Sequence, residues 1–337
     1  MNHPRAALLM RPDLPSDLFN ATSWERLNRV AHIVDPTPIS TWAKARDGGW
    51  QTDVEILLTG WGAPRIDEEA LENMPKLRAI VHAAGSVKDL ISPAAWKRGV
   101  VVSTAAEANS IPVAEFTLGC ILLALKRSWI AAARLSGIIQ GNVPTASSGP
   151  EKVGAYNRTI GIIGASRIGR RLVDLLQPYD VAVLVFDPYL TGDDAQRLGA
   201  EATDLENLLM RSDIVTLHAP SLPETKHIIN SHRLASMRDG ATLINTSRGA
   251  LVDHAALTQE VLAGRLYAVL DVTDPEPLPS EHPLLNAPGA FVTPHIGGAL
   301  GTEVRRLGDW AVDEVERYTN GVPFAGPVTL DDLSRIA

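Results

Sequence analysis

Short runs of apolar, β-branched residues alternate with stretches of helical periodicity over residues 5–113. Each apolar run has the length of a buried strand, and each intervening stretch repeats its apolar positions every three or four residues. The predicted strands are Ala6–Met10, Val30–Val34, Val54–Thr59, Leu77–Val81 and Val100–Val102, and the clearest predicted helices are Trp24–Arg29 and Ile66–Asn73. This alternation predicts an α/β unit built on a parallel sheet.

A long apolar helix is predicted where this first rhythm ends, from Val113 to about Ser128, with Pro112 near its first position. The apolar run 116–125 inside it is too short to cross a bilayer. A second helical stretch falls within 129–158. The Gly-, Pro- and Ser-rich segment 141–150 follows that stretch, and we expect it to be an exposed connection.

The alternation is clearer from Thr159 onward. The predicted strands are 159–163, 181–186, 213–217, 241–245, 266–271 and 290–292, and the predicted helices are 167–178, 204–210, 230–237 and 253–263. Six strands with crossover helices predict a doubly wound sheet of Rossmann type. A final amphipathic helix, at about Thr302–Thr319, comes after the last strand, and we expect it to pack back on the first unit.

The chain length of 337 residues favours two domains over a single core. Because the final helix is expected to return to the first unit, the first domain is predicted to be discontinuous, comprising 1–111 and 300–337. Residues 112–299 then form the Rossmann domain. We expect the first domain to contribute to substrate binding and the second to bind the cofactor.

A glycine-containing turn joins the first strand of the predicted Rossmann sheet to the helix that follows it. Its residues are Gly164, Ser166, Arg167, Ile168 and Gly169, in the spacing of a dinucleotide fingerprint. Backbone amides and the positive end of the helix dipole can hold a pyrophosphate at such a turn. Asp187 ends the next strand, where an acid binds the ribose hydroxyls of NAD. The alternative is an ordinary strand–turn–helix with no ligand.

Composition and charge narrow the partners and the compartment. The net charge is −8, with 31 Lys+Arg against 39 Asp+Glu, which argues against nucleic acid and acidic membrane surfaces. A single cysteine, Cys120, cannot form a disulfide within the chain and favours a reducing cytoplasm. Cys120 lies in an apolar run, so we predict a buried filler rather than a nucleophile.

Three polar clusters follow predicted strands in the second half of the Rossmann unit. The first presents Arg248, a guanidinium able to hold a carboxylate and polarise a neighbouring carbonyl. The second contains Asp271, which directly follows apolar strand residues, and Glu276, which stands between two prolines. The third presents His295 after Pro294. Taken singly, Arg248 is equally compatible with a surface ion pair, and each acid with a capping or turn role.

Two other histidines are weaker candidates for a functional role than His295, and no metal-binding spacing is found. His218 follows a strand and is interpreted as lining of the cofactor pocket or as structural. His82 precedes a small-residue turn and is expected to have an ordinary loop role. The sequence has no metal-ligand spacing, no nucleophile elbow and no P-loop, so no metal is expected.

Taken together, the motifs from about Asn109 to Gly298 resemble those of the D-isomer-specific 2-hydroxyacid dehydrogenases. The matching segments are Pro112–Glu115, the Gly164 turn, Asp187-Pro188, His218–Pro220 with Glu224-Thr225, Asn245–Gly249, Asp271-Val272 with Glu276–Leu278, and Thr293–Gly298. The resemblance implies a Rossmann-type NAD domain with a smaller flavodoxin-like substrate domain. It also implies a homodimer joined through the cofactor domain.

The same resemblance assigns roles to individual residues. Arg248, Glu276 and His295 would form the catalytic triad. Asp271 would contact the nicotinamide carboxamide, and His218, Thr246, Arg248 and His295 would also line the cofactor site. Backbone amides near Gly85 and Ser86 would bind the substrate together with Arg248 and His295.

The sequence departs from the family pattern at three places. Ser166 replaces the middle glycine of the nucleotide turn, and we expect its side chain to crowd the pyrophosphate modestly. Thr273 stands where an aromatic residue is usual. The loop 82–89 is shorter and less regular than the glycine-rich substrate loop of the family.

These expectations define an NAD(H)-dependent enzyme that interconverts a small 2-oxo acid and its 2-hydroxy acid. His295 would be the general acid, and Glu276 would orient it and favour its charged form. Two alternatives remain open at this point. One is a non-catalytic, NAD-sensing protein like the C-terminal-binding corepressors, and the other is an enzyme of the same fold acting on formate or phosphite.

Overall fold

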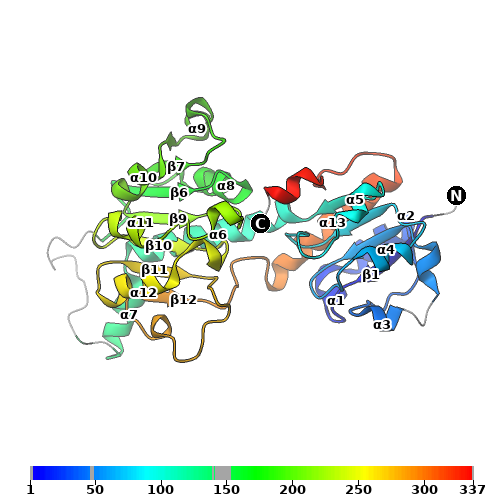
Figure 1. Ribbon diagram of the computed structural model, residues 1–337, viewed down its shortest axis with the longest axis horizontal. Coiled ribbons are helices and arrows are strands. Elements are labelled where there is room, and N and C mark those ends of the chain that lie inside the picture. Colours follow the sequence, from blue (N-terminus) through cyan, green and yellow to red (C-terminus); the bar gives the residue numbers. More distant parts are fainter. Residues whose placement is uncertain (1–2, 46–48, 139, 141–152, 336–337) are drawn as a thin grey trace. The chain divides into compact units, whose positions relative to one another are not determined.

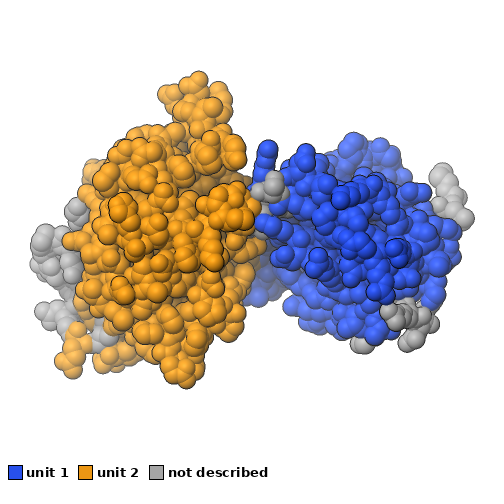
Figure 2. Space-filling model, in the orientation of Figure 1, with its two compact units in different colours: residues 1–110, 299–337 blue, residues 111–298 orange. Residues whose placement is uncertain are grey.

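The computed structural model describes residues 3–45, 49–138, 140 and 153–335 (Figure 1). The chain divides into two compact units, Met1–Ser110 with Ala299–Ala337, and Ile111–Gly298 (Figure 2). Both units are α/β, which confirms the predicted fold class. The segment 141–150 lies outside the described residues, so its predicted exposure stays a prediction.

The first unit is built on a six-stranded sheet of order β13-β5-β4-β3-β1-β2. Its strands are β1 (Arg5–Leu9), β2 (His32–Ile33), β3 (Ile56–Thr59), β4 (Ala79–His82), β5 (Val101–Thr104) and β13 (Pro327–Val328). Its helices are α1 (Leu14–Leu18), α2 (Ala21–Val30), α3 (Trp42–Ala45), α4 (Glu68–Glu72), α5 (Ala94–Lys97) and α13 (Val304–Thr319), with 3₁₀ turns at Trp50–Asp53, Gly301–Glu303 and Asp331–Ser334. The five parallel strands have the 2-1-3-4-5 order of a flavodoxin-like sheet.

Both faces of this sheet are covered, as a parallel sheet requires. On one face, residues such as Leu8 and Leu58 pack with apolar residues of α1, α2 and α13. On the other, Leu9 and Leu57 pack with residues of α4, α5 and the connecting loops. Alternate residues of each strand therefore serve two separate apolar layers, which explains why the strands are apolar at consecutive positions.

The tail of the chain adds a strand that the sequence analysis missed. β13 pairs antiparallel with β5, with Val328 opposite Val102. The predicted parallel sheet is confirmed for β1–β5, and β13 adds one antiparallel strand at its edge that was not predicted. Two residues of strand carry no detectable apolar period, so the sequence offered no signal for it.

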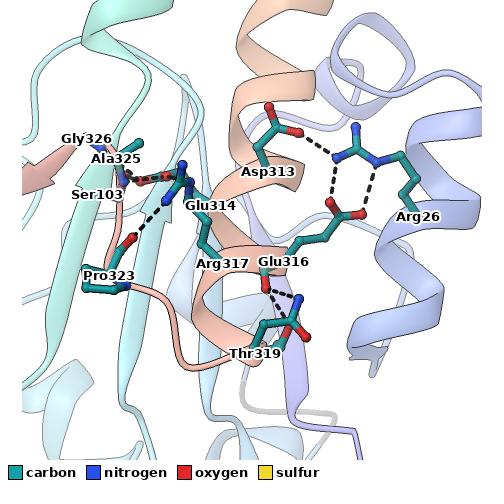
Figure 3. A network of polar contacts seen from close by, with 11 residues as sticks. Arg26, Ser103, Asp313, Glu314, Glu316, Arg317, Thr319, Pro323, Ala325 and Gly326 are labelled. Atoms are coloured by element: carbon teal, nitrogen blue, oxygen red, sulfur yellow. Dashed lines mark hydrogen bonds and ion pairs between the residues drawn. The ribbon is translucent and has the colours of Figure 1, made fainter.

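A buried carboxylate attaches this tail to the sheet (Figure 3). The side chain of Glu314, on α13, is only 1% exposed. It accepts hydrogen bonds from the backbone amides of Ala325 and Gly326 at 2.8 and 3.1 Å and from the Ser103 hydroxyl on β5. A carboxylate that is removed from water needs such donors, so helix, strand and tail are held to one another at this point.

The second unit has a seven-stranded, wholly parallel sheet of order β12-β11-β10-β9-β6-β7-β8. Its strands are β6 (Arg158–Ile163), β7 (Val181–Phe186), β8 (Glu201–Ala202), β9 (Ile214–Leu217), β10 (Thr242–Asn245), β11 (Tyr267–Leu270) and β12 (Ala290–Val292). Its helices are α7 (Ser128–Leu135), α8 (Arg167–Leu176), α9 (Gly192–Leu198), α10 (Leu205–Arg211), α11 (Ser231–Ser236) and α12 (His254–Leu262), with 3₁₀ turns at Pro223–Thr225, Gly249–Leu251 and Pro283–Leu285. Most of α6 (Ala106–Leu125) also belongs to this unit.

This sheet confirms the predicted Rossmann-type architecture and corrects the strand count. The predicted bounds 181–186 and 290–292 match β7 and β12. The predicted strands for β6, β9 and β10 differ by one residue at one end, and the prediction for β11 differs by one residue at each end. The seventh strand, β8, and the helix α9 before it were missed. Only Ala195 of α9 is buried, so that helix has no apolar stripe from which it could be predicted.

The long helix α6 begins earlier than predicted. Pro112 lies inside α6 and not near its first position, because the helix starts at Ala106. Proline there removes one backbone donor, and the helix continues through it. At 20 residues, α6 is long and apolar enough to cross a membrane by length and composition alone, although the run 116–125 is not. In its most apolar window 56% is buried inside the protein, as in the core helix of a folded domain.

We predict that Glu314→Ala lowers the free energy of unfolding of the first unit by about 3 kcal/mol. The substitution leaves two backbone amides and the Ser103 hydroxyl without their buried acceptor, at about 1–3 kcal/mol for each donor that water does not reach. Urea-induced unfolding measures the change.

Asp313→Asn is the matched control, because Asp313 lies on the same helix and forms a surface ion pair with Arg26 at 2.5 Å. It should change the free energy of unfolding by less than about 1 kcal/mol. Equal effects of the two substitutions would contradict the role given to Glu314.

Candidate active site

The turn after β6 is closed so tightly that two of its positions accept only glycine. Gly164 has φ +104°, and a Cβ there would lie 2.7 Å from backbone atoms of His218 and Ala219. A Cβ on Gly169 would lie 2.0 Å from the carbonyl oxygen of Gly164. These are the tight turn and the close helix–strand packing that a dinucleotide fingerprint requires.

Ser166 has a defined role in this turn. It is the N-cap of α8, and its Oγ accepts a hydrogen bond from the amide of Gly169 at 3.3 Å. Arg167 and Ile168 are therefore the first two residues of the helix. The hydroxyl stabilises the start of the helix that would face a pyrophosphate, a role that the sequence analysis did not assign to it.

Asp187 lies directly after β7 and its carboxylate is fixed at the same turn. One oxygen accepts from the amide of Ala165 at 2.8 Å, and the other from the amide of Tyr189 at 2.8 Å. A carboxylate oxygen has two lone pairs, so both oxygens can still accept from a ribose hydroxyl. The turn, the helix start and the acid thus fit an NAD adenosine-side site.

The loop after β10 is organised by its own side chains. The buried Asn245 donates from Nδ2 to the carbonyl oxygen of Arg248 at 2.8 Å and accepts at Oδ1 from the amide of Ser247 at 3.0 Å. The guanidinium of Arg248 donates to the Ser247 carbonyl at 2.7 Å. Thr246 is 2.9 Å from Thr117, oxygen to oxygen. The loop conformation that presents Arg248 is therefore set locally.

Gly249 brings this loop against the loop after β11. A Cβ at Gly249 would lie 1.9 Å from the carbonyl oxygen of Thr273. No other residue type fits at that separation without displacing backbone. Gly249 belongs to the Asn245–Gly249 motif, whose spacing in the sequence does not reveal this contact.

The carboxylate of Asp271 holds the loop that carries His295. Asp271 is 2% exposed. One of its oxygens accepts from the Thr293 hydroxyl at 2.6 Å and the Ile296 amide at 2.8 Å, and the other accepts from the Gly297 amide at 2.8 Å. Asp271 is thus a structural anchor for this loop, in addition to the cofactor contact predicted for it.

His295 and Glu276 form a hydrogen-bonded pair. Nδ1 of His295 lies 2.6 Å from Oε1 of Glu276. His295 has φ +55°, a left-handed conformation that is uncommon for a residue other than glycine. Its amide donates to the carbonyl oxygen of Asp271 at 2.9 Å. The two side chains are 50% and 41% exposed, so the pair is open to a reactant.

Three further titratable groups are buried. Burial lowers the pKa of His218 to about 3 and the pKa of His82 to about 4. Nε2 of His218 lies 3.0 Å from the Thr216 hydroxyl, and its buried Nδ1 has no hydrogen-bond partner among the described residues.

Burial, with the charge of Asp271 as a smaller cause, raises the pKa of the Cys120 thiol to about 12. Cys120 is therefore the buried filler that was predicted.

Two of the four predicted substrate residues, Gly85 and Ser86, lie in the first unit, and Arg248 and His295 lie in the second. Gly85 and Ser86 follow β4 in the first unit, and the Ser86 hydroxyl accepts from the amide of Lys88 at 3.4 Å. His82, which ends β4, is hydrogen-bonded to Thr59 at 2.8 Å and is part of the strand rather than the loop.

Within the described part of the chain, no group of three or more His, Cys, Asp or Glu side chains could hold a metal ion.

Residues 121–297 match the family model for the NAD binding domain of the D-isomer specific 2-hydroxyacid dehydrogenases. The match spans more than half of the chain and contains the glycine turn and the three loops described above. The chain belongs to this family. Its second unit is accordingly an NAD binding domain, and the glycine turn with Asp187 has the geometry that this cofactor needs.

Individual relatives agree with this assignment. The glyoxylate reductase of Thermofilum pendens is 36% identical over 252 residues, which are 73% of each chain. The D-3-phosphoglycerate dehydrogenase of Methanocaldococcus jannaschii is 30% identical over 80% of this chain and 50% of its own. The chain thus spans about half the length of the phosphoglycerate dehydrogenases it matches. The structure of a phosphoglycerate oxidoreductase from Rhizobium etli superposes with a TM-score of 0.76 at 26% identity, covering 96% of this chain and 97% of the other.

We predict that His218 makes the stability of the second unit depend on pH. Below the ordinary histidine pKa of about 6.5, the unfolded chain binds a proton that folded His218 does not bind until about pH 3. The stability associated with neutral His218 is complete above pH 6.5 and is lost as the pH falls toward 3. The loss amounts to about 2 kcal/mol between pH 7 and pH 5, at about 1.4 kcal/mol per pH unit below 6.5.

Urea-induced unfolding at the two pH values tests this for the wild type, His218→Asn and the control His232→Asn, whose side chain is exposed. The wild type and the control should lose about 2 kcal/mol more than His218→Asn. The same loss in all three proteins would show that His218 is not the titrating group.

Proposed function

We propose that the protein is an NAD(H)-dependent dehydrogenase that interconverts a small 2-oxo acid and the corresponding 2-hydroxy acid. The observation that carries this proposal is the 2.6 Å hydrogen bond between His295 and Glu276, on loops that the Asp271 and Gly249 contacts hold beside the Arg248 loop. A positioned imidazole and a guanidinium near a nicotinamide-binding sheet edge are the groups that carbonyl reduction needs. The catalytic assignment is therefore Arg248, Glu276 and His295.

The geometry gives each of these side chains a separate task. With Nδ1 of His295 bonded to Glu276, the proton is transferred from Nε2 to the substrate oxygen. Glu276 orients the ring through this hydrogen bond. Arg248 binds the substrate carboxylate through its planar fork and polarises the adjacent carbonyl. Gly85 and Ser86 belong to the first unit, and their part in substrate binding stays a prediction.

The NAD binding residues position the cofactor and take no part in proton transfer. The turn of Gly164, Ser166 and Gly169 would hold the pyrophosphate, and Asp187 would accept from the ribose hydroxyls. His218, Thr246 and Asp271 directly follow β9, β10 and β11 at the same sheet edge and would line the nicotinamide part of the site. Bound NADH supplies the hydride that the substrate carbon accepts.

A panel of substrates tests the proposed reaction. Purified protein is assayed with NADH against glyoxylate, hydroxypyruvate, its 3-phosphate and larger 2-oxo acids, and with NAD⁺ against formate and phosphite. Turnover of at least one 2-oxo acid, with no turnover of formate or phosphite, is expected. Turnover of formate or phosphite alone, or of nothing in the panel while NADH still binds, would overturn the proposal.

We also propose a homodimer joined through the NAD binding unit and a cytoplasmic location. The apolar helix α6 is only partly buried, and Leu123 on it is 48% exposed. Leu135 and Ile138, on and just after α7, are 82% and 77% exposed. Apolar side chains gathered on one unit favour association with a second copy.

The single, buried cysteine suits a reducing compartment. Nucleic acid and membrane partners are not expected, given the acidic net charge.

The oligomeric state can be tested by light scattering after gel filtration. The wild type should have twice the mass of the chain, and Leu135→Asp should shift the equilibrium toward the monomer, because a desolvated carboxylate is costly at an interface. Val322→Asp, at a 44% exposed position of the first unit, is the control and should stay dimeric. A monomeric wild type would contradict the proposal.

We predict that His295→Gln lowers kcat by a factor of roughly 10²–10⁴ with NADH binding little changed, the usual contribution of a positioned proton donor. Glu276→Gln should also lower kcat, because a neutral amide holds the imidazole less firmly than the carboxylate that lies 2.6 Å from Nδ1. Asp274→Asn, in the same loop, is the control and should keep near-normal turnover. Near-normal turnover in His295→Gln or in Glu276→Gln would remove that residue from the mechanism.

We predict a preference for NADH over NADPH, because the fixed carboxylate of Asp187 repels a 2′-phosphate. Steady-state kinetics with both cofactors measures the preference. Asp187→Ser should reduce it by at least tenfold, mainly through a higher KM for NADH. A wild type that uses NADPH equally well would contradict this assignment.

A further inference from the structure

The loop after β11 changes from buried to exposed within a few residues. Residues 271–273 are at most 7% exposed, whereas residues 274–277 are all exposed. Leu278, which follows them, is buried again in an apolar core of the second unit. The exposed segment 274–277 carries Glu276, the hydrogen-bond partner of His295, so the conformation of this segment decides where the carboxylate lies.

This exposed segment has few means of holding its own conformation. Pro275 and Pro277 carry no backbone N–H, so neither can donate a hydrogen bond that closes a turn. Within the described part of the chain, the backbone of 274–277 takes part in one hydrogen bond, which the Thr273 hydroxyl donates to the Pro275 carbonyl at 2.8 Å. That carbonyl belongs to the same planar peptide group as the nitrogen of Glu276. Thr273 therefore fixes the peptide plane from which the Glu276 side chain extends.

The Thr273 hydroxyl is a rigid donor because the residue that carries it is held in place. A Cβ on Gly249 would lie 1.9 Å from the carbonyl oxygen of Thr273, so the two backbones are in direct contact. Two residues earlier, the amide of Asp271 donates to the carbonyl oxygen of Asn245 at 3.0 Å. The Thr273 side chain is buried and β-branched, which restricts its rotation about χ1. The hydrogen bond to Pro275 thus connects the exposed segment to a fixed part of the loop.

We infer that Thr273 is a positioning residue, whose hydroxyl holds Glu276 where its carboxylate orients the His295 imidazole. This role rests on the proposed function, in which a proton passes from Nε2 of the imidazolium to the substrate oxygen. The neutral ring then keeps its proton on Nδ1, because only a protonated Nδ1 can donate to the Glu276 carboxylate 2.6 Å away. A correctly placed carboxylate therefore selects one tautomer of His295, and a misplaced one does not.

The tautomer of His295 tests this role without relying on turnover. The ring nitrogens of the intact protein are observed by ¹⁵N NMR at about pH 9, well above the ordinary histidine pKa of about 6.5, and His295→Gln identifies the signals. Thr273→Val removes the hydroxyl and keeps the β-branched shape, whereas Thr273→Ser keeps the hydroxyl. We expect the Nδ1–H tautomer in the wild type and in Thr273→Ser, and a larger share of the Nε2–H tautomer in Thr273→Val.

Steady-state kinetics separates positioning from a merely structural role. Thr273→Val should lower kcat for 2-oxo acid reduction about threefold to tenfold, the size expected for one hydrogen bond, with the KM for the 2-oxo acid and NADH binding little changed. Thr273→Ser should restore most of this loss. In a Glu276→Ala background, Thr273→Val should have no further effect on kcat, because its hydroxyl acts through Glu276.

Thr258→Val is the matched control, because it removes a hydroxyl that donates to the His254 carbonyl on α12, 2.6 Å away in the same unit. It should behave as the wild type does in both measurements. An unchanged tautomer or a normal kcat in Thr273→Val, equal impairment of Thr273→Ser, or a further loss in the Glu276→Ala background would overturn the inference. A wild type that turns over no 2-oxo acid would contradict the proposed function, and the tautomer of His295 would still decide the role of Thr273.

Discussion

The arrangement of the candidate active site depends on the hydrogen bonds that the buried carboxylate of Asp271 accepts. A charge removed from water is tolerated only where donors replace the lost hydration. Here the donors are the Thr293 hydroxyl and the amides of Ile296 and Gly297, all from the loop that carries His295. Satisfying Asp271 therefore forces that loop into one conformation. His295 is held in a left-handed conformation as a consequence, at a cost of about 1–2 kcal/mol that the surrounding contacts offset.

Close backbone approach is the second constraint. Gly249 lets the Arg248 loop touch the backbone at Thr273, and Gly169 lets α8 touch the turn at Gly164. At both glycines the neighbouring backbone lies closer than a Cβ atom would permit. The carboxyl edge of the sheet thus carries a compact set of loops, in which neighbouring residues hold the hydrogen-bonded pair of His295 and Glu276 in place. The first unit contributes a separate flavodoxin-like sheet whose tail is anchored by Glu314.

The sequence predicted those features that leave a local pattern. Strands such as β7 and β12 are apolar runs of strand length, and Arg248, Glu276 and His295 lie in loops that follow strands. That position and the family resemblance together made these three residues the catalytic candidates. Features without a local pattern were missed. The strand β13 is two residues long, α9 buries only Ala195, and Pro112 is tolerated inside α6 by a helix that starts before it. The cap made by Ser166 and the anchor made by Asp271 depend on atoms that only the fold brings together.

A double-mutant cycle between Asp271 and His295 tests the central claim most directly. kcat and the dissociation constant of NADH are measured for Asp271→Asn, His295→Gln and the double variant with the best 2-oxo acid. If Asp271 acts through the His295 loop, Asp271→Asn should lower kcat at least about tenfold, and the double variant should be no slower than His295→Gln, with NADH binding weakened far less than turnover. Fully additive losses in kcat, or normal turnover in Asp271→Asn, would contradict the account.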